Sequence, residues 1–137
     1  MLIEHERHIA KFLEFVLTKA GYEVAVAYNG LQALAAAEPF EPDAVVVDLV
    51  VPGMSGLEIL KRLRADSRQA SPVIILFGAR ALGDLPNEVL EAGANAYCTK
   101  PIAPSTLLKQ LRDLGVPPTI EKRLGAPFPG EVDEGTA

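Results

Sequence analysis

The sequence predicts an α/β fold, a doubly wound five-stranded parallel sheet, from two observations. The first is a regular alternation of strand-like and helix-like segments along most of the chain. The second is a pair of short apolar runs, "AVVVDL" at residues 44–49 and "PVIILF" at residues 72–77, in which polar and apolar residues do not alternate. Such runs are typical of strands covered on both faces, as in parallel sheets. Parallel strands need crossover connections of one hand, which leads to helices on both faces of the sheet.

Three weaker segments complete the predicted sheet. The run "YEVAVA" at residues 22–27 alternates and is rich in strand-forming residues, and "NAYCT" at residues 95–99 is a short last strand. Only "MLI" precedes Glu4, so the first strand is predicted to be very short.

Helices are predicted between the strands and after the last one. Apolar residues at helical spacing from Ile9 to Ala20, with Gly21 as a stop, indicate the first helix. Asn29 is a suitable N-cap for a second helix over residues 31–38. Further helices are expected over residues 57–65, over residues 85–93, and from Pro104 onward.

Length and composition limit the class of protein. The chain has 137 residues, 49% of them hydrophobic and 23% charged, which suits one domain with a hydrophobic core. A net charge of −5 argues against direct contact with nucleic acid or with an anionic membrane surface. The start, "MLIEHERHIAKF", is charged where a signal peptide is apolar, and a single cysteine fits a reducing compartment. We therefore expect a cytoplasmic protein, with residues 1–115 as the domain and residues 116–137 as a flexible, Pro/Gly-rich tail.

One acid, Asp48, stands at the end of an apolar run, where burial would normally exclude it. In an open parallel sheet, ligands bind outside the carboxyl ends of the strands. Glu4 and His5 follow the first strand and Lys100 follows the last, so these residues should meet Asp48 at one edge. Carboxylates can hold a divalent cation, and a carboxylate can attack a phosphoryl group. A lysine and a metal ion then stabilise the charge on the phosphoryl oxygens.

Five segments in a fixed order carry a family resemblance. They are "EHE" (4–6), "KAGYEV" (19–24), "AYNGLQAL" (27–34), "DLVVPGMSGLE" (48–58) and "YCTKPI" (97–102). With these segments, roughly residues 2–114 resemble the receiver domain of bacterial response regulators, the proteins that receive a phosphoryl group in two-component signalling. The resemblance implies a flavodoxin-like fold with strand order 2-1-3-4-5.

The resemblance also implies roles for individual residues. Asp48 is the phosphoacceptor, and Lys100, before a Pro101 peptide that is often cis in the family, contacts the phosphoryl group. Glu4, His5, Asp48 and the backbone carbonyl of Val50 stand at the positions of the Mg²⁺ ligands. Tyr97 stands at the position of the switch aromatic residue.

Two residues depart from the family pattern. His5 replaces an acid that ligates the metal, so we expect weak Mg²⁺ binding, with Mn²⁺ better tolerated. Glu6 is the nearest substitute for that acid, and loss of the metal site is the alternative. Gly78 replaces the Ser or Thr that bonds the phosphoryl oxygen. Counting from Pro72 places Phe77 at that position instead, but neither residue has a hydroxyl group.

We interpret the chain as a stand-alone receiver without an output domain, phosphorylated on Asp48 by a sensor histidine kinase or phosphotransfer protein. It would signal through a downstream protein, and a homodimer through the fourth helix, fifth strand and fifth helix is the self-association that the resemblance implies. It would not be an enzyme, except in catalysing its own phosphorylation and dephosphorylation. The alternative is a pseudo-receiver, a binding module that acts without phosphorylation, which the departures at His5 and Gly78 favour.

Overall fold

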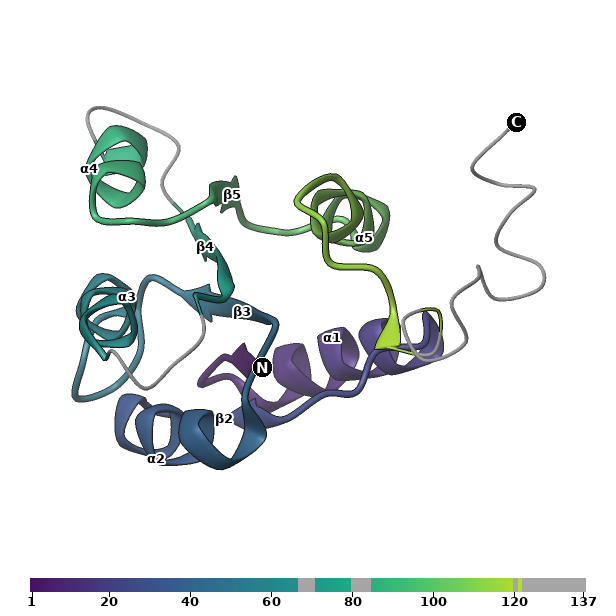
Figure 1. Ribbon diagram of the computed structural model, residues 1–137, viewed down its shortest axis with the longest axis horizontal. Coiled ribbons are helices and arrows are strands. Elements are labelled where there is room, and N and C mark those ends of the chain that lie inside the picture. The colour runs from purple at the N-terminus through teal and green to yellow at the C-terminus, as the bar shows by residue number, and fades with distance from the viewer. Residues whose placement is uncertain (67–70, 80–84, 120, 122–137) are drawn as a thin grey trace.

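Five parallel strands form one sheet in the order β2-β1-β3-β4-β5, with helices on both faces (Figure 1). The computed structural model describes residues 1–66, 71–79, 85–119 and 121. The elements are β1 (Leu2–Ile3), α1 (Arg7–Lys19), β2 (Val26–Ala27), α2 (Gly30–Phe40), β3 (Ala44–Asp48), α3 (Gly56–Ala65), β4 (Val73–Gly78), α4 (Leu85–Glu91), β5 (Ala96–Thr99) and α5 (Pro104–Asp113). The predicted fold class and strand order are confirmed. Among the described residues, no helix is long and apolar enough to cross a membrane.

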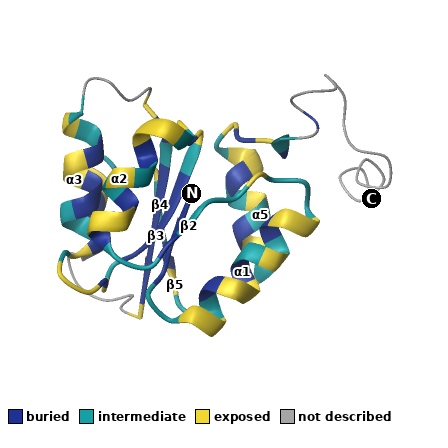
Figure 2. Ribbon diagram, turned by 90° about the horizontal axis from the view of Figure 1, so that it is seen from below, coloured by how far each residue is buried: buried dark blue, intermediate teal, exposed yellow. Residues whose placement is uncertain are grey.

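The central strands are buried on both faces, which explains their unbroken apolar runs. In β3, Val45 and Val47 belong to one hydrophobic cluster and Val46 to another, because successive strand residues point to opposite faces. In Figure 2, α2 and α3 lie on one side of the sheet and α1 and α5 on the other. The first cluster also holds Val89 of α4, so α4 covers the same face as α2 and α3.

The helix signals in the sequence correspond to caps in the structure. The side chain of Asn29 accepts a hydrogen bond from the Gln32 amide, as predicted for the start of α2. Gly21, after α1, has a φ of 101°, a left-handed conformation that favours glycine. The helices begin and end within two or three residues of the predicted positions.

The second strand is shorter than predicted. The sequence predicts a strand over residues 22–27, but only Val26–Ala27 pair with β1. An edge strand can be no longer than its single partner, and β1 itself has only Leu2–Ile3. Residues 22 and 23 bond to the C-terminal segment instead. The Tyr22 hydroxyl donates to the Val116 carbonyl at 2.6 Å, and the Glu23 amide donates to Thr119 Oγ1 at 3.0 Å.

The first residues after the predicted domain boundary pack against the domain. Val116 is buried in the cluster under α1 and α5. The Arg112 guanidinium donates to both carboxylate oxygens of the buried Glu121, at 2.8 and 3.2 Å. Val116, Thr119 and Glu121 therefore contact the domain, although they lie in the segment that the sequence assigns to a flexible tail. Residues 120 and 122–137 of the predicted tail lie outside the described residues.

Arg64, near the end of α3, joins three segments at the opposite edge of the sheet from Asp48. Its Nε and Nη2 donate to the Gly93 carbonyl at 2.9 and 2.8 Å, and its Nη1 donates to the Pro72 carbonyl at 2.7 Å. Its Nη2 also donates to Asn95 Oδ1, which accepts from the Ile74 amide as well. Burial lowers the pKa of the Arg64 guanidinium. This network fixes α3 to the start of β4 and to the turn before β5.

We expect Arg64→Met to lower the free energy of unfolding by about 2–3 kcal/mol, because partly buried carbonyl groups lose their donors. Arg62→Met, on the same helix, is the matched control. Within the part of the chain that the structure describes, Arg62 pairs with Glu58 alone, and both side chains are exposed, so its loss should change stability by less than about 0.5 kcal/mol. Urea denaturation of both variants measures the difference, and equal effects would contradict the role given to Arg64.

Candidate functional site

The strand register brings the polar residues together at the carboxyl edge. Ile3 of β1 pairs with Val47 of β3, so the next residues of the two strands, Glu4 and Asp48, lie side by side. Gly78 pairs with Thr99 at the end of β5, directly before Lys100. The structure thus brings Glu4, Asp48 and Lys100 together, as their places at strand ends predict. Their chemical roles remain predictions.

A single lysine pairs with two buried carboxylates. Lys100 Nζ donates to Asp48 Oδ2 at 2.7 Å and to Glu4 Oε1 at 3.0 Å. Asp48 is 2% exposed and Glu4 is 0% exposed. Burial alone lowers the pKa of the Lys100 ammonium, but its hydrogen bonds to Asp48 and Glu4 and their negative charges outweigh that effect. The net result is a pKa raised above the usual value for lysine. Removal of Lys100 would therefore leave two buried carboxylates without a cation.

Backbone amides fix the orientation of both carboxylates. The Val50 amide donates to Asp48 Oδ1 at 3.0 Å, and the Glu6 amide donates to Glu4 Oε2 at 3.1 Å. The peptide bond between Lys100 and Pro101 is cis, as the family resemblance implies. The metal-ligand role of the Val50 carbonyl remains a prediction.

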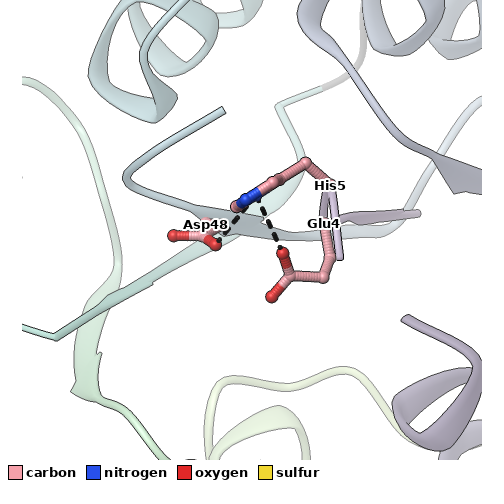
Figure 3. A group of neighbouring side chains, drawn as sticks. All are labelled: Glu4, His5 and Asp48. Carbon is pink, nitrogen blue, oxygen red and sulfur yellow. Dashed lines mark ion pairs between the residues drawn. The ribbon is translucent and has the colours of Figure 1, made fainter. Parts of the chain in front are cut away.

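His5 directs a ring nitrogen toward both carboxylates (Figure 3). Its Nδ1 lies 3.3 Å from Glu4 Oε2 and 3.8 Å from Asp48 Oδ2. One ligand atom from each of Glu4, His5 and Asp48 lies within 4.8 Å of the others, so the three can share one ion. The two carboxylates suit Mg²⁺, which prefers oxygen ligands, but the imidazole does not. The donor set therefore fits a divalent cation, and only two of its three members fit Mg²⁺.

The structure separates Glu6 from this group. The Glu6 carboxylate lies 3.6 Å from His8 Nε2, whose side chain is largely exposed. The alternative in which Glu6 replaces the missing acid has no support in this arrangement.

Tyr97 fills the space beside Gly78. A Cβ atom built on Gly78 would lie 2.9 Å from the Tyr97 hydroxyl and 3.2 Å from Leu49 Cβ. Gly78 itself is buried, and Tyr97 and Leu49 both pack against the hydrophobic cluster under α2, α3 and α4. A side chain at position 78 would therefore have to displace the Tyr97 hydroxyl. The sequence did not indicate the closeness of Gly78 to Tyr97 and Leu49.

One neighbour of the site was not anticipated. The ammonium of Lys100 lies 5.2 Å from the centre of the buried Phe77 ring, within the range of a cation–π contact. The order of the strands could have indicated this contact. Phe77 of β4 pairs with Asp48 of β3 and with Cys98 of β5, so it lies between Asp48 and the strand that leads to Lys100.

Comparisons with known proteins agree with this fold and show the family. The family model described as "Response regulator receiver domain" matches residues 1–112. The transcriptional regulatory protein YkoG of Bacillus subtilis is 40% identical over 114 residues, which cover 82% of this chain and 48% of YkoG. The DNA-binding response regulator MtrA of Mycobacterium tuberculosis is 36% identical over the same length and coverage. The chain therefore spans about half the length of the curated relatives that it matches.

Solved structures show the same architecture. The chemotaxis response regulator CheY4 of Vibrio cholerae aligns with a TM-score of 0.77 at 30% identity, over 82% of this chain and 94% of CheY4. The receiver domain of the Francisella response regulator 1452 also gives a TM-score of 0.77, at 26% identity, over 82% of this chain and 92% of that domain.

We expect Lys100→Met to lower the free energy of unfolding by about 2–4 kcal/mol in the presence of a chelator, because Glu4 and Asp48 lose their counter-charge. The raised pKa of Lys100 fixes the sign of the pH dependence. The stabilisation is fully present below the usual pKa of lysine and is lost as the pH rises through the higher pKa of the folded state.

Lys109→Met is the control for this variant. Lys109 pairs with Asp113 at 2.6 Å, but the Lys109 side chain is 76% exposed, so its loss should have almost no effect. Urea denaturation of both variants at neutral and alkaline pH tests the prediction. Similar losses in the two variants would show that the pairs of Lys100 contribute no more than a surface ion pair.

Proposed function

We propose that this chain, which belongs to the response regulator receiver domain family, accepts a phosphoryl group on Asp48 and signals through protein–protein contact. One observation carries the proposal. Asp48 is a buried carboxylate whose Oδ2 lies 2.7 Å from the Lys100 ammonium, at an edge of the sheet where ligands bind.

The proposed donor is a phosphohistidine of a sensor histidine kinase or a phosphotransfer protein. An Asp48 carboxylate oxygen forms a bond to phosphorus while the bond from phosphorus to the donor imidazole nitrogen breaks. Lys100 is placed to bind a phosphoryl oxygen, and the Val50 amide holds the carboxylate in one orientation. Receiver domains generally bind Mg²⁺ at an acidic site, and here Glu4 and Asp48 would supply its carboxylate ligands. A bound dication would supply positive charge to the phosphoryl oxygens. The chain acts as a phosphoacceptor and at most catalyses its own phosphorylation and dephosphorylation.

A hollow beside the site supports docking of a protein donor. Its volume is about 510 Å³, and Lys100, Pro101, Ile9 and Phe12 are among its lining residues. Phe12 is 52% exposed and adds apolar surface to this hollow, next to Ile9 and Pro101. A donor that docks here would have its phosphohistidine close to Asp48.

The downstream partner of this chain is proposed to be a protein rather than a nucleic acid. MtrA is named as a DNA-binding regulator, but this chain matches only about half of its length. The net charge of −5 gives no reason to assign a DNA contact to these residues. We assign the output to the face formed by α4, β5 and α5, with a downstream protein or a second copy of the chain as partner in the cytoplasm.

A second function, that of a pseudo-receiver, is favoured by the contact between Gly78 and Tyr97. Without a hydroxyl group at position 78, the phosphoryl group has no side chain there to bond, and Tyr97 already occupies the space beside it. In this case a partner would recognise the α4, β5 and α5 face whether or not Asp48 is phosphorylated.

We expect the chain to gain one phosphate from acetyl phosphate or from a cognate kinase when a divalent cation is present. Intact-mass spectrometry detects the adduct, and Asp48→Asn, which keeps the shape of the side chain, should remain unmodified. Absence of an adduct with every donor and cation tried would favour the pseudo-receiver.

We further expect a beryllium fluoride mimic to shift the amide signals near Asp48 strongly and those of α4 and α5 weakly. The reason is that a ligand shifts a conformational equilibrium only by its differential affinity for the two states, and Gly78 contributes none of it. Gly78→Thr should enlarge the shifts in α4 and α5, since its side chain must displace the Tyr97 hydroxyl. Gly78→Ala displaces the hydroxyl without adding a donor and is the control.

Large shifts in α4 and α5 of the unmodified chain would show that another route carries the signal. Light scattering on the same samples measures whether the mimic produces a homodimer.

A further inference from the structure

The Nδ1 atom of His5 is buried and has no hydrogen-bond partner among the described residues. Glu4 Oε2 is 3.3 Å away, but the geometry is not that of a hydrogen bond. Asp48 Oδ2, at 3.8 Å, is beyond hydrogen-bond distance. Figure 3 shows the ring edge directed at both carboxylates. A buried polar atom without a partner is rare in folded proteins, so this arrangement requires a reason.

The charges around Nδ1 indicate what is missing. If the imidazole is neutral with its lone pair on Nδ1, that lone pair faces two carboxylate oxygens, which is repulsive. Lys100 binds the Asp48 Oδ2 that faces His5, at 2.7 Å, but on Glu4 it binds Oε1 and leaves Oε2 directed toward His5, so only part of the repulsion is offset. A cation shared by the nitrogen and the two oxygens would turn all three contacts into attractions.

The spacing suits a small dication. First-row metal ions bind nitrogen and oxygen ligands at about 2.0–2.2 Å, so two ligands of one ion lie at most about 4.4 Å apart. The distances of 3.3 and 3.8 Å from Nδ1 to the two carboxylate oxygens are within that limit. Glu6 does not supply a further oxygen, because its carboxylate turns to His8 at the surface.

We propose that His5 Nδ1 is a metal ligand, so that this site prefers a borderline first-row transition-metal dication, such as Mn²⁺ or Co²⁺, over Mg²⁺. Imidazole suits ions of this class, whereas Mg²⁺ requires oxygen ligands in a nearly octahedral array. The inference rests on the proposed function only for the expectation that a cation binds beside Asp48. On this proposal, His5 gives the site a different metal preference and is not merely a lost ligand of a magnesium site.

Direct binding to the full chain tests the metal preference. Isothermal titration with MgCl₂, MnCl₂ and CoCl₂ should give Mn²⁺ and Co²⁺ affinities at least about tenfold above that of Mg²⁺, with Co²⁺ the tightest. His5→Asp should raise the Mg²⁺ affinity and lower that of Co²⁺. His5→Gln, which removes the nitrogen ligand without adding charge, should lose the preference. His8→Gln, at an exposed histidine in the first turn of α1, should leave it unchanged.

A second measurement uses the unmodified chain and does not depend on any variant folding. Substoichiometric Mn²⁺ should broaden the ring signals of His5 selectively, with those of His8 much less affected, because paramagnetic broadening falls steeply with distance. Equal affinity for Mg²⁺ and Mn²⁺, an unchanged preference in His5→Gln, or sharp His5 signals with Mn²⁺ bound would each overturn the proposal.

The result can be separated from the proposed function. If a Mg²⁺-dependent phosphate adduct forms on Asp48 and Mn²⁺ and Co²⁺ bind no more tightly than Mg²⁺, the metal inference fails and the phosphoacceptor function stands. If Co²⁺ binds through His5 but no phosphate adduct forms, the function fails and the metal site stands.

Discussion

The burial of two carboxylates beside one lysine is the constraint on which the rest of the site depends. Glu4 and Asp48 are almost completely buried, and Lys100 is the cation that both share. Two carboxylates and one ammonium leave one negative charge when His5 is neutral. Phosphorylation would replace the charge of Asp48 by about two negative charges. The site can then approach neutrality only if a dication is present, so the need for a metal follows from the charges of these residues.

The sheet explains why such an arrangement is tolerated. Parallel strands end at the same edge, and the residues after β1, β3 and β5 must meet there whatever their chemistry. Backbone amides of Glu6 and Val50 hold the carboxylates in place, so folding sets the positions of the charges before any ligand arrives. The hydrophobic clusters on the two faces supply the stability that this charged edge does not.

The parts that the sequence predicts well are those that follow from the place of each residue within its own strand or helix. The apolar runs of β3 and β4 follow from burial on both faces, and the convergence of Glu4, Asp48 and Lys100 follows from their places at strand ends. The length of β2 could not be predicted, because the length of its partner β1 limits it. The network around Arg64 and the packing of Val116 join segments far apart in the chain, and no local pattern indicates such contacts. The orientation of the Tyr97 side chain could not be predicted either, because a glycine at position 78 permits more than one orientation of its neighbour.

The departures at His5 and Gly78 act on different steps of the same proposed event. His5 faces the charges that a cation must neutralise, so it bears on whether and with which ion Asp48 can be phosphorylated. Gly78 adjoins the Tyr97 hydroxyl, so it bears on whether the α4, β5 and α5 face responds afterwards. Each residue sits on a different strand end, and no described hydrogen bond or ion pair connects them. A chain of this kind can therefore keep the chemistry of a phosphoacceptor while its output face is decoupled from it. For this reason, detection of phosphate on Asp48 would not by itself distinguish a switch from a binding module. Only the response of the α4, β5 and α5 face makes that distinction. Coupling between two sites requires an element whose two states differ in their affinity for the ligand.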